Sequence, residues 1–289
     1  MTPDLFERSI FDLINEKARA LEDCLMSDVI FYHGSIYPNY FRTFRDFVEE
    51  VALRSEREEK TISVVLRTGG GSADTTEKMV NVLRNHYEKV YFVVPDMAMS
   101  AGTIFCMSGD KIFMDYASSL GPIDPQVPTP DTGDYVPALG YLDKVTEITK
   151  KGQLEQADVV LLKSLDLAKL ALFEQARDLS IDLLTDWLVN YKFRDWTVHR
   201  TTNPGQPVTP DEKATRAKQI ASDLADHKRW RSHGRNLDVG KLKDLRIEID
   251  DYTNDLNMRS AIRDYNDPLT GYVDRTRIEF YLHHHQVQS

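Results

Sequence analysis

Short apolar runs alternate with segments of helical periodicity through the first 115 residues of the chain. Three runs, at residues 29–32, 62–66 and 90–94, are rich in β-branched and aromatic residues. Runs of this length and composition are typical of strands that are buried on both faces. A fourth strand is predicted at residues 111–115, after a Gly-Asp turn.

Segments with helical spacing separate these runs. Residues 40–53 form one amphipathic segment, and a second begins after residues 72–74, where either Ser72 or Asp74 can cap a helix. Alternating strands and helices favour right-handed βαβ units, so the fold class is α/β with a mostly parallel sheet. An earlier helix is predicted at residues 5–25. It is either an arm that packs on a neighbouring subunit or a first helix that covers its own sheet.

The second half of the chain is predicted to be mainly helical. Helices are expected at residues 141–150, at 155–191 with a break near 164–166, and at 209–227, where Thr209 and Pro210 provide a cap and a first-turn proline. Residues 122–137 are rich in proline and read as a loop. From residue 236 onward the chain is charged and weakly patterned.

These patterns divide the chain into three segments. We expect a helical arm at residues 1–27, a core domain at 28–200 and a helical, charged extension at 201–289. The histidines at 283–285 are expected to be solvated rather than bound to a metal, because no carboxylate or cysteine at ligand spacing accompanies them.

Composition narrows the class of protein. The net charge of −10 argues against a broad nucleic-acid surface, and two cysteines are too few for a disulfide framework or a four-thiolate zinc site. No apolar run reaches the length of a membrane span, and the start of the chain lacks the features of a signal peptide. We therefore expect an intracellular, cytoplasmic protein that uses no metal or cofactor.

The candidate chemistry lies where two of the predicted strands end. Ser100 follows the third strand, in the small apolar segment MAMSAG, and a TGGGS motif at residues 68–72 follows the second strand. A hydroxyl at the start of an apolar helix lies among unpaired backbone N–H groups, which are the surroundings that an acyl-transfer nucleophile needs. Adjacent glycines let N–H groups approach a reacting carbonyl. The alternatives are a capping serine and a plain tight turn.

Two histidines and several lysines are further candidates. His227 and His233 flank the segment KRWRS, which is either part of an active site or a surface basic patch. The lysines at 144, 150, 151, 163 and 169 are expected on solvated helix faces, although a buried one could serve as a neutral amine.

Three motifs together resemble the ClpP/crotonase superfamily. They are TGGGS at residues 68–72, MSAG at 99–102 and LGPIDP at 120–125. The resemblance is closer to the SppA-like branch of serine dehydrogenase proteinases and covers roughly residues 28–240. It implies a ClpP/crotonase fold of repeated ββα units with a helical carboxyl-terminal half, and a homo-oligomer.

The same resemblance implies roles for individual residues. Ser100 would be the nucleophile, the N–H groups of Gly70 and Ala101 would form the oxyanion hole, and a substrate strand would pair along the edge at Gly69 and Gly71.

The resemblance leaves two alternatives for the general base, because ClpP-like peptidases have a histidine where this chain has Asp124. A Ser–Asp–His order makes Asp124 the orienting acid and His233 the base, with His227 in reserve. A Ser–Lys pair of SppA type would instead use Lys151 or Lys169.

The resulting prediction is a serine peptidase that cleaves peptides or unfolded proteins through an acyl-enzyme on Ser100. Two alternatives stay open. The first is a non-proteolytic hydrolase of thioesters or other acyl compounds on the same fold. The second is an inactive scaffold or binding subunit, which the absence of a histidine at position 124 favours.

Overall fold

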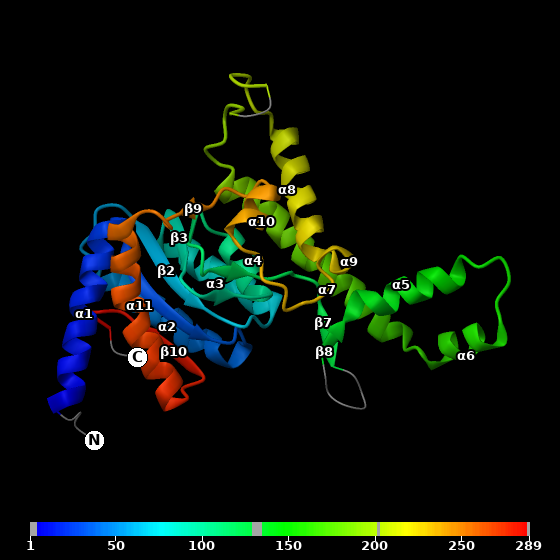
Figure 1. Cartoon of the computed structure of the whole chain (residues 1–289), viewed down its shortest axis with the longest axis horizontal. Helices are drawn as coiled ribbons and strands as arrows, with labels where there is room; N and C mark the ends of the chain where they lie inside the picture. The colour runs from blue at the N-terminus through cyan, green and yellow to red at the C-terminus, as the bar shows by residue number, and fades with distance from the viewer. Residues whose placement is uncertain (1–4, 129–134, 201–202, 288–289) are drawn as a thin grey trace.

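A six-stranded sheet forms the centre of the protein (Figure 1). The structure is a computed structural model and describes residues 5–128, 135–200 and 203–287. The strand order is β10-β1-β2-β3-β5-β9. Neighbouring strands are parallel except β10, which runs antiparallel to β1, so the predicted mostly parallel α/β sheet is confirmed. The strands are β1 (Asp28–Gly34), β2 (Thr61–Arg67), β3 (Lys89–Val94), β5 (Lys111–Met114), β9 (Asp250–Asp251) and β10 (Phe280–His283).

Each apolar strand contributes to two cores, because successive side chains of a strand point to opposite faces. In β1, Val29 and Phe31 belong to one core, and Ile30 and Tyr32 belong to the other. The first face is covered by α1 and α11, and the second by the helices that connect the parallel strands (Figure 1). These covering helices are α1 (Leu5–Leu25) and α11 (Leu256–Thr276), then α2 (Pro38–Arg54), α3 (Ala73–His86) and α4 (Ala101–Met107).

The first helix covers its own sheet. Ile14, Ala18 and Leu21 are fully buried against the sheet and α11, and they recur at the spacing of one helix face. Of the two interpretations of residues 5–25, the structure therefore has the covering helix rather than an arm.

The last third of the chain is more ordered than its sequence suggested. It contributes β9 and β10 to the main sheet, together with α10 (Val239–Asp244) and the long helix α11. In α11, Tyr265 and Leu269 are fully buried although charged residues and Pro268 interrupt the pattern. Residues before 28 pack into one of the two cores, and residues after 200 pack into both. The division into three domains stays a prediction.

The remaining helices pack around α4 or extend beyond the sheet. The predicted break near residues 164–166 separates the helix Gln156–Ser164 from the helix Leu167–Trp187. Residues Leu188–Lys192 continue the second helix as a π-helix. Helices α7 and α8 pack on each other and α7 contacts α4, whereas α5 and α6 project away from the sheet (Figure 1). These elements are α5 (Ala138–Thr149), α6 (Gln156–Ser164), α7 (Leu167–Trp187), η1 (Leu188–Lys192), α8 (Pro210–Ala225) and α9 (His227–Trp230).

Part of the proline-rich loop forms a hairpin. Strands β7 (Gln126–Pro128) and β8 (Tyr135–Pro137) pair with each other, and the residues between them lie outside the described part of the chain. Among the described helices, none is both long and apolar enough to cross a bilayer.

Candidate active site

The glycine turn and the Ser100 turn touch each other. The short strand β4 (Met97–Ala98) bridges to Thr68 at the end of β2, through Thr68 N–H to Met97 and Met99 N–H to Thr68, both at 3.0 Å. A Cβ atom placed on Gly70 would lie 2.7 Å from Ser100 Cβ and 3.2 Å from Ala101 N. Any side chain at position 70 would therefore fill the space beside Ser100.

Ser100 has an unusual backbone conformation. Its φ and ψ angles are 53° and −118°, a region in which non-glycine residues are rare, and α4 begins at the next residue. The side chain is partly exposed and makes no capping hydrogen bond. Within the described chain, no acceptor bonds the N–H group of Ala101. The capping interpretation of Ser100 is therefore wrong, and a free hydroxyl lies beside a free amide donor.

The N–H group of Gly70 is occupied. It donates to Thr68 Oγ1 at 3.0 Å, so the donor expected for the oxyanion hole is already bonded inside the protein. Ile36 pairs with the groups on either side of Gly71, because Ile36 N–H bonds to Gly70 O and Ser72 N–H bonds to Ile36 O. By the alternation of an extended chain, the N–H of Gly71 faces away from Ile36.

Asp124 and His233 form the acid–histidine pair. His233 Nδ1 lies 2.9 Å from Asp124 Oδ1, across a sequence separation of 109 residues. The carboxylate is 2% exposed, and its second oxygen accepts from Gln126 Nε2 at 2.7 Å. Because a carboxylate only accepts, Nδ1 carries the proton, and Nε2 of the neutral ring is left as a base. The imidazole is 25% exposed, so solvent and substrate can reach it.

Backbone pairing holds the two halves of this pair. Leu120 and Leu237 exchange N–H···O bonds of 3.1 and 2.8 Å, and Ile123 N–H donates to Leu224 O at 3.0 Å. Trp230 Nε1 donates to Asp223 O at 2.7 Å and anchors the loop that carries His233 to the end of α8.

Thr103 links the Ser100 turn to the segment that carries Asp124. Its buried hydroxyl lies 2.9 Å from Ala98 O and 2.8 Å from Gly121 O, and it accepts from Gly121 N–H at 2.9 Å. Thr103 stands three residues after Ser100, and Gly121 three before Asp124. Sequence analysis missed this residue, since a threonine on a small apolar helix has no distinctive signal.

The reserve candidates have other partners. His227 Nε2 lies 3.0 Å from Asp143 Oδ2, so it belongs to a separate acid–histidine pair. Lys151 is exposed and bonds Asp158 at 2.7 Å, and this hydrogen bond raises the pKa of the lysine, opposite to what a neutral base needs. The side chain of Lys169 lies outside the described part of the structure.

A pocket of about 510 Å³ opens beside the glycine turn. Its lining includes Thr68 and Gly69 and, farther out, Tyr37, Tyr40 and Arg67. A larger pocket of about 1120 Å³ surrounds Lys192 and Trp196. Ser100, Asp124 and His233 are not among its described lining residues.

The sequence pattern of one family, the ClpP-like SDH-type serine proteinases, matches residues 34–205. The chain belongs to this family. The match spans Ser100 and Asp124, whereas His233 lies beyond it. The protein therefore belongs to a family of ClpP-like serine proteinases, and its own structure is a mixed α/β fold with a mostly parallel sheet.

Curated relatives and solved structures add further similarities. Two uncharacterised proteins of Methanocaldococcus jannaschii, MJ1495 and MJ0137, are 30% identical over 72% of this chain and 32% identical over 64%. The matches span only 59% and 60% of the relatives' lengths.

Two solved structures of the 1510-N membrane-bound stomatin-specific protease also align. A serine-to-alanine mutant aligns with a TM-score of 0.44 at 15% identity, covering 77% of this chain and 79% of that one. A lysine-to-alanine mutant bound to a substrate peptide has a TM-score of 0.34 at 22% identity, and the alignment covers 42% and 57% of the two chains.

Proposed function

We propose that this protein is a serine peptidase with Ser100 as nucleophile, Asp124 as orienting acid and His233 as general base. The observation that carries the proposal is the 2.9 Å contact between Asp124 and His233, next to a segment that Thr103 ties to the Ser100 turn. Membership of a serine proteinase family supports the same reaction class.

The proposed reaction has two steps. In the first, Ser100 Oγ attacks a peptide carbonyl while His233 Nε2 accepts the hydroxyl proton and then delivers it to the leaving amine, which leaves an acyl-enzyme. In the second, water gives a proton to His233 and attacks the ester, and the protonated imidazole returns the proton to Ser100. Asp124 stays ionised and holds the tautomer with the proton on Nδ1.

Two free amide donors would stabilise the oxyanion. Among the described residues nothing accepts from Ala101 N–H at the start of α4, and Gly71 N–H faces away from Ile36. We assign the hole to these two groups instead of Ala101 and Gly70, because Gly70 N–H already bonds Thr68.

The substrate would bind as an extended strand. The edge at Gly69 and Gly71 would pair with the main chain of a peptide or an unfolded protein, and the pocket at Tyr37 and Tyr40 would take one of its side chains. Assembly as a homo-oligomer and a cytoplasmic location remain predictions from the resemblance and the composition.

A fluorophosphonate probe tests the nucleophile and its base. The oxygen of an activated serine displaces fluoride, so wild-type protein is expected to label and Ser100→Ala is not. His233→Ala and Asp124→Asn are expected to slow labelling by several orders of magnitude. The matched control is His227→Ala, which removes the other acid–histidine pair and should label at the wild-type rate. Equal labelling rates for His233→Ala and His227→Ala would exclude His233 as the base.

Substrate class is tested by turnover. We expect hydrolysis of unstructured casein to exceed hydrolysis of acyl-thioesters, with both lost in Ser100→Ala. Turnover of thioesters alone would support the acyl hydrolase instead. Folded wild-type protein that neither labels nor turns over substrate would support a scaffold. The contact between His233 and Asp124 favours the peptidase, because it offers a candidate base other than a histidine at position 124.

A further inference from the structure

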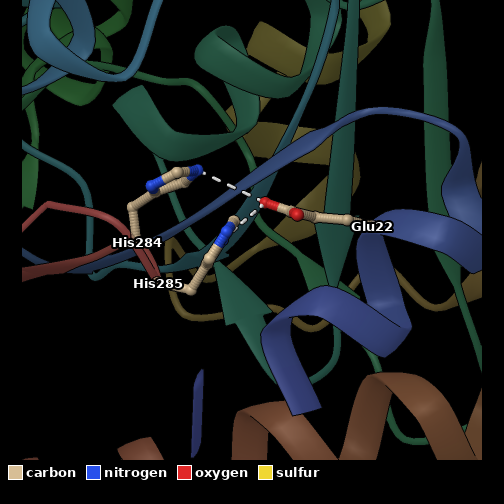
Figure 2. A group of neighbouring side chains, drawn as sticks. All are labelled: Glu22, His284 and His285. Atoms are coloured by element: carbon tan, nitrogen blue, oxygen red, sulfur yellow. Dashed lines mark ion pairs between the residues drawn. The ribbon is translucent and has the colours of Figure 1, made fainter. Parts of the chain in front are cut away.

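Three side chains from opposite ends of the chain converge near the amino end of β1. Glu22 lies near the end of α1, and His284 and His285 follow β10 (Figure 2). His284 Nε2 lies 3.3 Å from Glu22 Oε1, and His285 Nδ1 lies 3.2 Å from the same oxygen. The three candidate ligand atoms are all within 4.8 Å of one another.

Strand register brings them together. His283 pairs with Phe31 in the antiparallel ladder, so the chain continues past His283 toward the amino end of β1. Val29 N–H at that end donates to Glu22 Oε1 at 3.3 Å. The histidines at 283–285 were expected in solvent, but His283 and His284 are buried and His285 is half-buried. His284 and His285 lie next to a carboxylate more than 250 residues earlier. The cluster lies at the amino ends of the strands, away from Ser100 at their carboxyl ends.

One nitrogen of each histidine in this cluster makes no hydrogen bond within the described structure. Glu22 and His284 are 5% and 3% exposed, yet His284 Nε2 and His285 Nδ1 have no hydrogen-bond partner in the described structure. Both form ion-pair contacts with Glu22 Oε1, drawn as dashed lines in Figure 2, but neither contact has hydrogen-bond geometry. Unsatisfied buried nitrogens are costly, so this arrangement requires an explanation.

A cation bound by all three side chains would explain the arrangement. Ligands about 2.0–2.2 Å from a tetrahedral zinc ion are separated by about 3.3–3.6 Å, and both measured separations lie at or just below that range. We propose that Glu22, His284 and His285 bind a divalent transition-metal ion, with Zn²⁺ as the best match to two imidazoles and one carboxylate.

Metal binding requires one local rearrangement. Gln286 N–H donates to His284 Nδ1 at 3.2 Å in this structure, which places the imidazole proton on Nε2. A metal on Nε2 moves that proton to Nδ1, so the contact from Gln286 must open. The surroundings suit the added charge, because the carboxylates of Glu22, Asp23 and Asp28 all lie within 4 Å of the Arg57 guanidinium and outnumber it.

The metal would fasten the carboxyl-terminal segment to α1. Strand β10 is an edge strand, and two ligands directly behind it would prevent it from fraying. This role does not depend on the hydrolytic reaction.

Zinc titration of the chelator-treated full chain tests the site. Calorimetry is expected to show one Zn²⁺ per chain and a higher melting temperature, with Mg²⁺ producing neither. Glu22→Gln and His285→Ala are expected to weaken Zn²⁺ binding at least tenfold. His86→Ala, a partly exposed histidine elsewhere, is the matched control and should bind normally. Bound Co²⁺ should give the visible absorption of a four- or five-coordinate site.

Two outcomes would overturn the proposal. One is unchanged Zn²⁺ affinity in Glu22→Gln and His285→Ala. The other is loss of binding in His233→Ala, which would place the ion at the acid–histidine pair instead. If the variants do not fold, the wild-type protein decides: one equivalent of Zn²⁺ must shift the imidazole NMR signals of His284 and His285 but not those of His86, and unchanged signals would overturn the proposal.

Discussion

Ser100 combines a reactive position with a strained backbone. Its φ of 53° is adopted readily only by glycine, yet the residue is a serine, and the proposed mechanism requires its hydroxyl. Such conformations cost roughly 1–3 kcal/mol and persist where the surroundings hold them. At Ser100 these surroundings are Gly70 on one side and the buried helix α4 on the other.

Replacing Ser100 by glycine is therefore expected to stabilise the fold while abolishing activity. We predict that Ser100→Gly raises the free energy of unfolding by about 1 kcal/mol, because glycine adopts this conformation without steric cost. Ser100→Ala is the control, since it keeps the strain and loses only the hydroxyl. Urea denaturation measures both, and equal stability of the two variants would show that the conformation is not strained.

The buried amine of Lys192 is expected to make the stability of the protein depend on pH. The residue is half-buried beside the larger pocket, and burial lowers its pKa to about 8, although Asp250 and Glu248 oppose the shift. Between about pH 8 and the ordinary value of 10.5, the unfolded chain holds this proton and the folded protein does not. Deprotonation therefore stabilises the fold as pH rises through that window.

Substitution of Lys192 by methionine is expected to remove this dependence. At pH 7 we predict that Lys192→Met is more stable than wild type by about 1–2 kcal/mol, because the cost of burying the charge is gone. The advantage should shrink between pH 8 and 10.5 as the wild-type lysine loses its proton. Denaturation curves over that range measure the difference, and a constant difference would contradict the assignment.

At the scale of elements, the site depends on one short helix and the hydrogen bonds at its first turn. Helix α4 is entirely buried, and its Gly102 allows close packing, because a Cβ there would lie 2.4 Å from Thr68 Cγ2. Thr103 then fixes the segment before Asp124 to the same turn. The position of Ser100 relative to Asp124, the proposed nucleophile and orienting acid, is therefore set by contacts of α4 rather than by a loop.

Removing the Thr103 hydroxyl is expected to loosen both segments. In Thr103→Val, Gly121 N–H loses its acceptor in a buried site, at a cost of about 1–3 kcal/mol. We also predict slower fluorophosphonate labelling. Thr149→Val is the matched control, because that exposed hydroxyl bonds only carbonyls of its own helix. Thermal denaturation and labelling rates measure the two effects, and equal behaviour of both variants would remove Thr103 from the site.

At the scale of the whole molecule, both ends of the chain complete one face of the sheet. Helices α1 and α11 pack side by side over β1, β2 and β3 (Figure 1). In this core Tyr265 is fully buried, meets Phe31 edge to face at 6.4 Å and lies 3.0 Å from His283 Nδ1 through its hydroxyl. The last strand, the last helix and the first helix therefore stabilise one another.

Truncating Tyr265 is expected to destabilise the whole protein. We predict that Tyr265→Ala lowers the free energy of unfolding by about 3–5 kcal/mol, since it opens a cavity under the first and last helices. Leu172→Ala, at a position 60% exposed on α7, should change stability by less than about 0.5 kcal/mol. Circular dichroism during thermal denaturation measures both, and a small effect of Tyr265→Ala would mean that the two ends are not coupled to the core.

Local sequence determined much of this protein. The four apolar runs, the helices between them and the turns at residues 68–72 and 99–102 were predictable, because periodicity, capping and glycine content act over neighbouring residues. The meeting of these turns also followed from sequence, since parallel strands end at one edge of the sheet. Helix α11 and strand β10 were missed, since charged residues and Pro268 obscured the helix and a single edge strand carries a weak pattern.

Only the tertiary structure decided the contacts between distant segments. Asp124 contacts His233 rather than His227, and Gly70 N–H donates to Thr68 Oγ1. Glu22 lies next to the histidines that follow β10. No short sequence pattern predicts these contacts, because each depends on strand register and helix packing. Register and packing result from many weak interactions along the whole chain. Sequence neighbours indicate the chemistry that a side chain can perform, but the tertiary structure determines which residue it contacts.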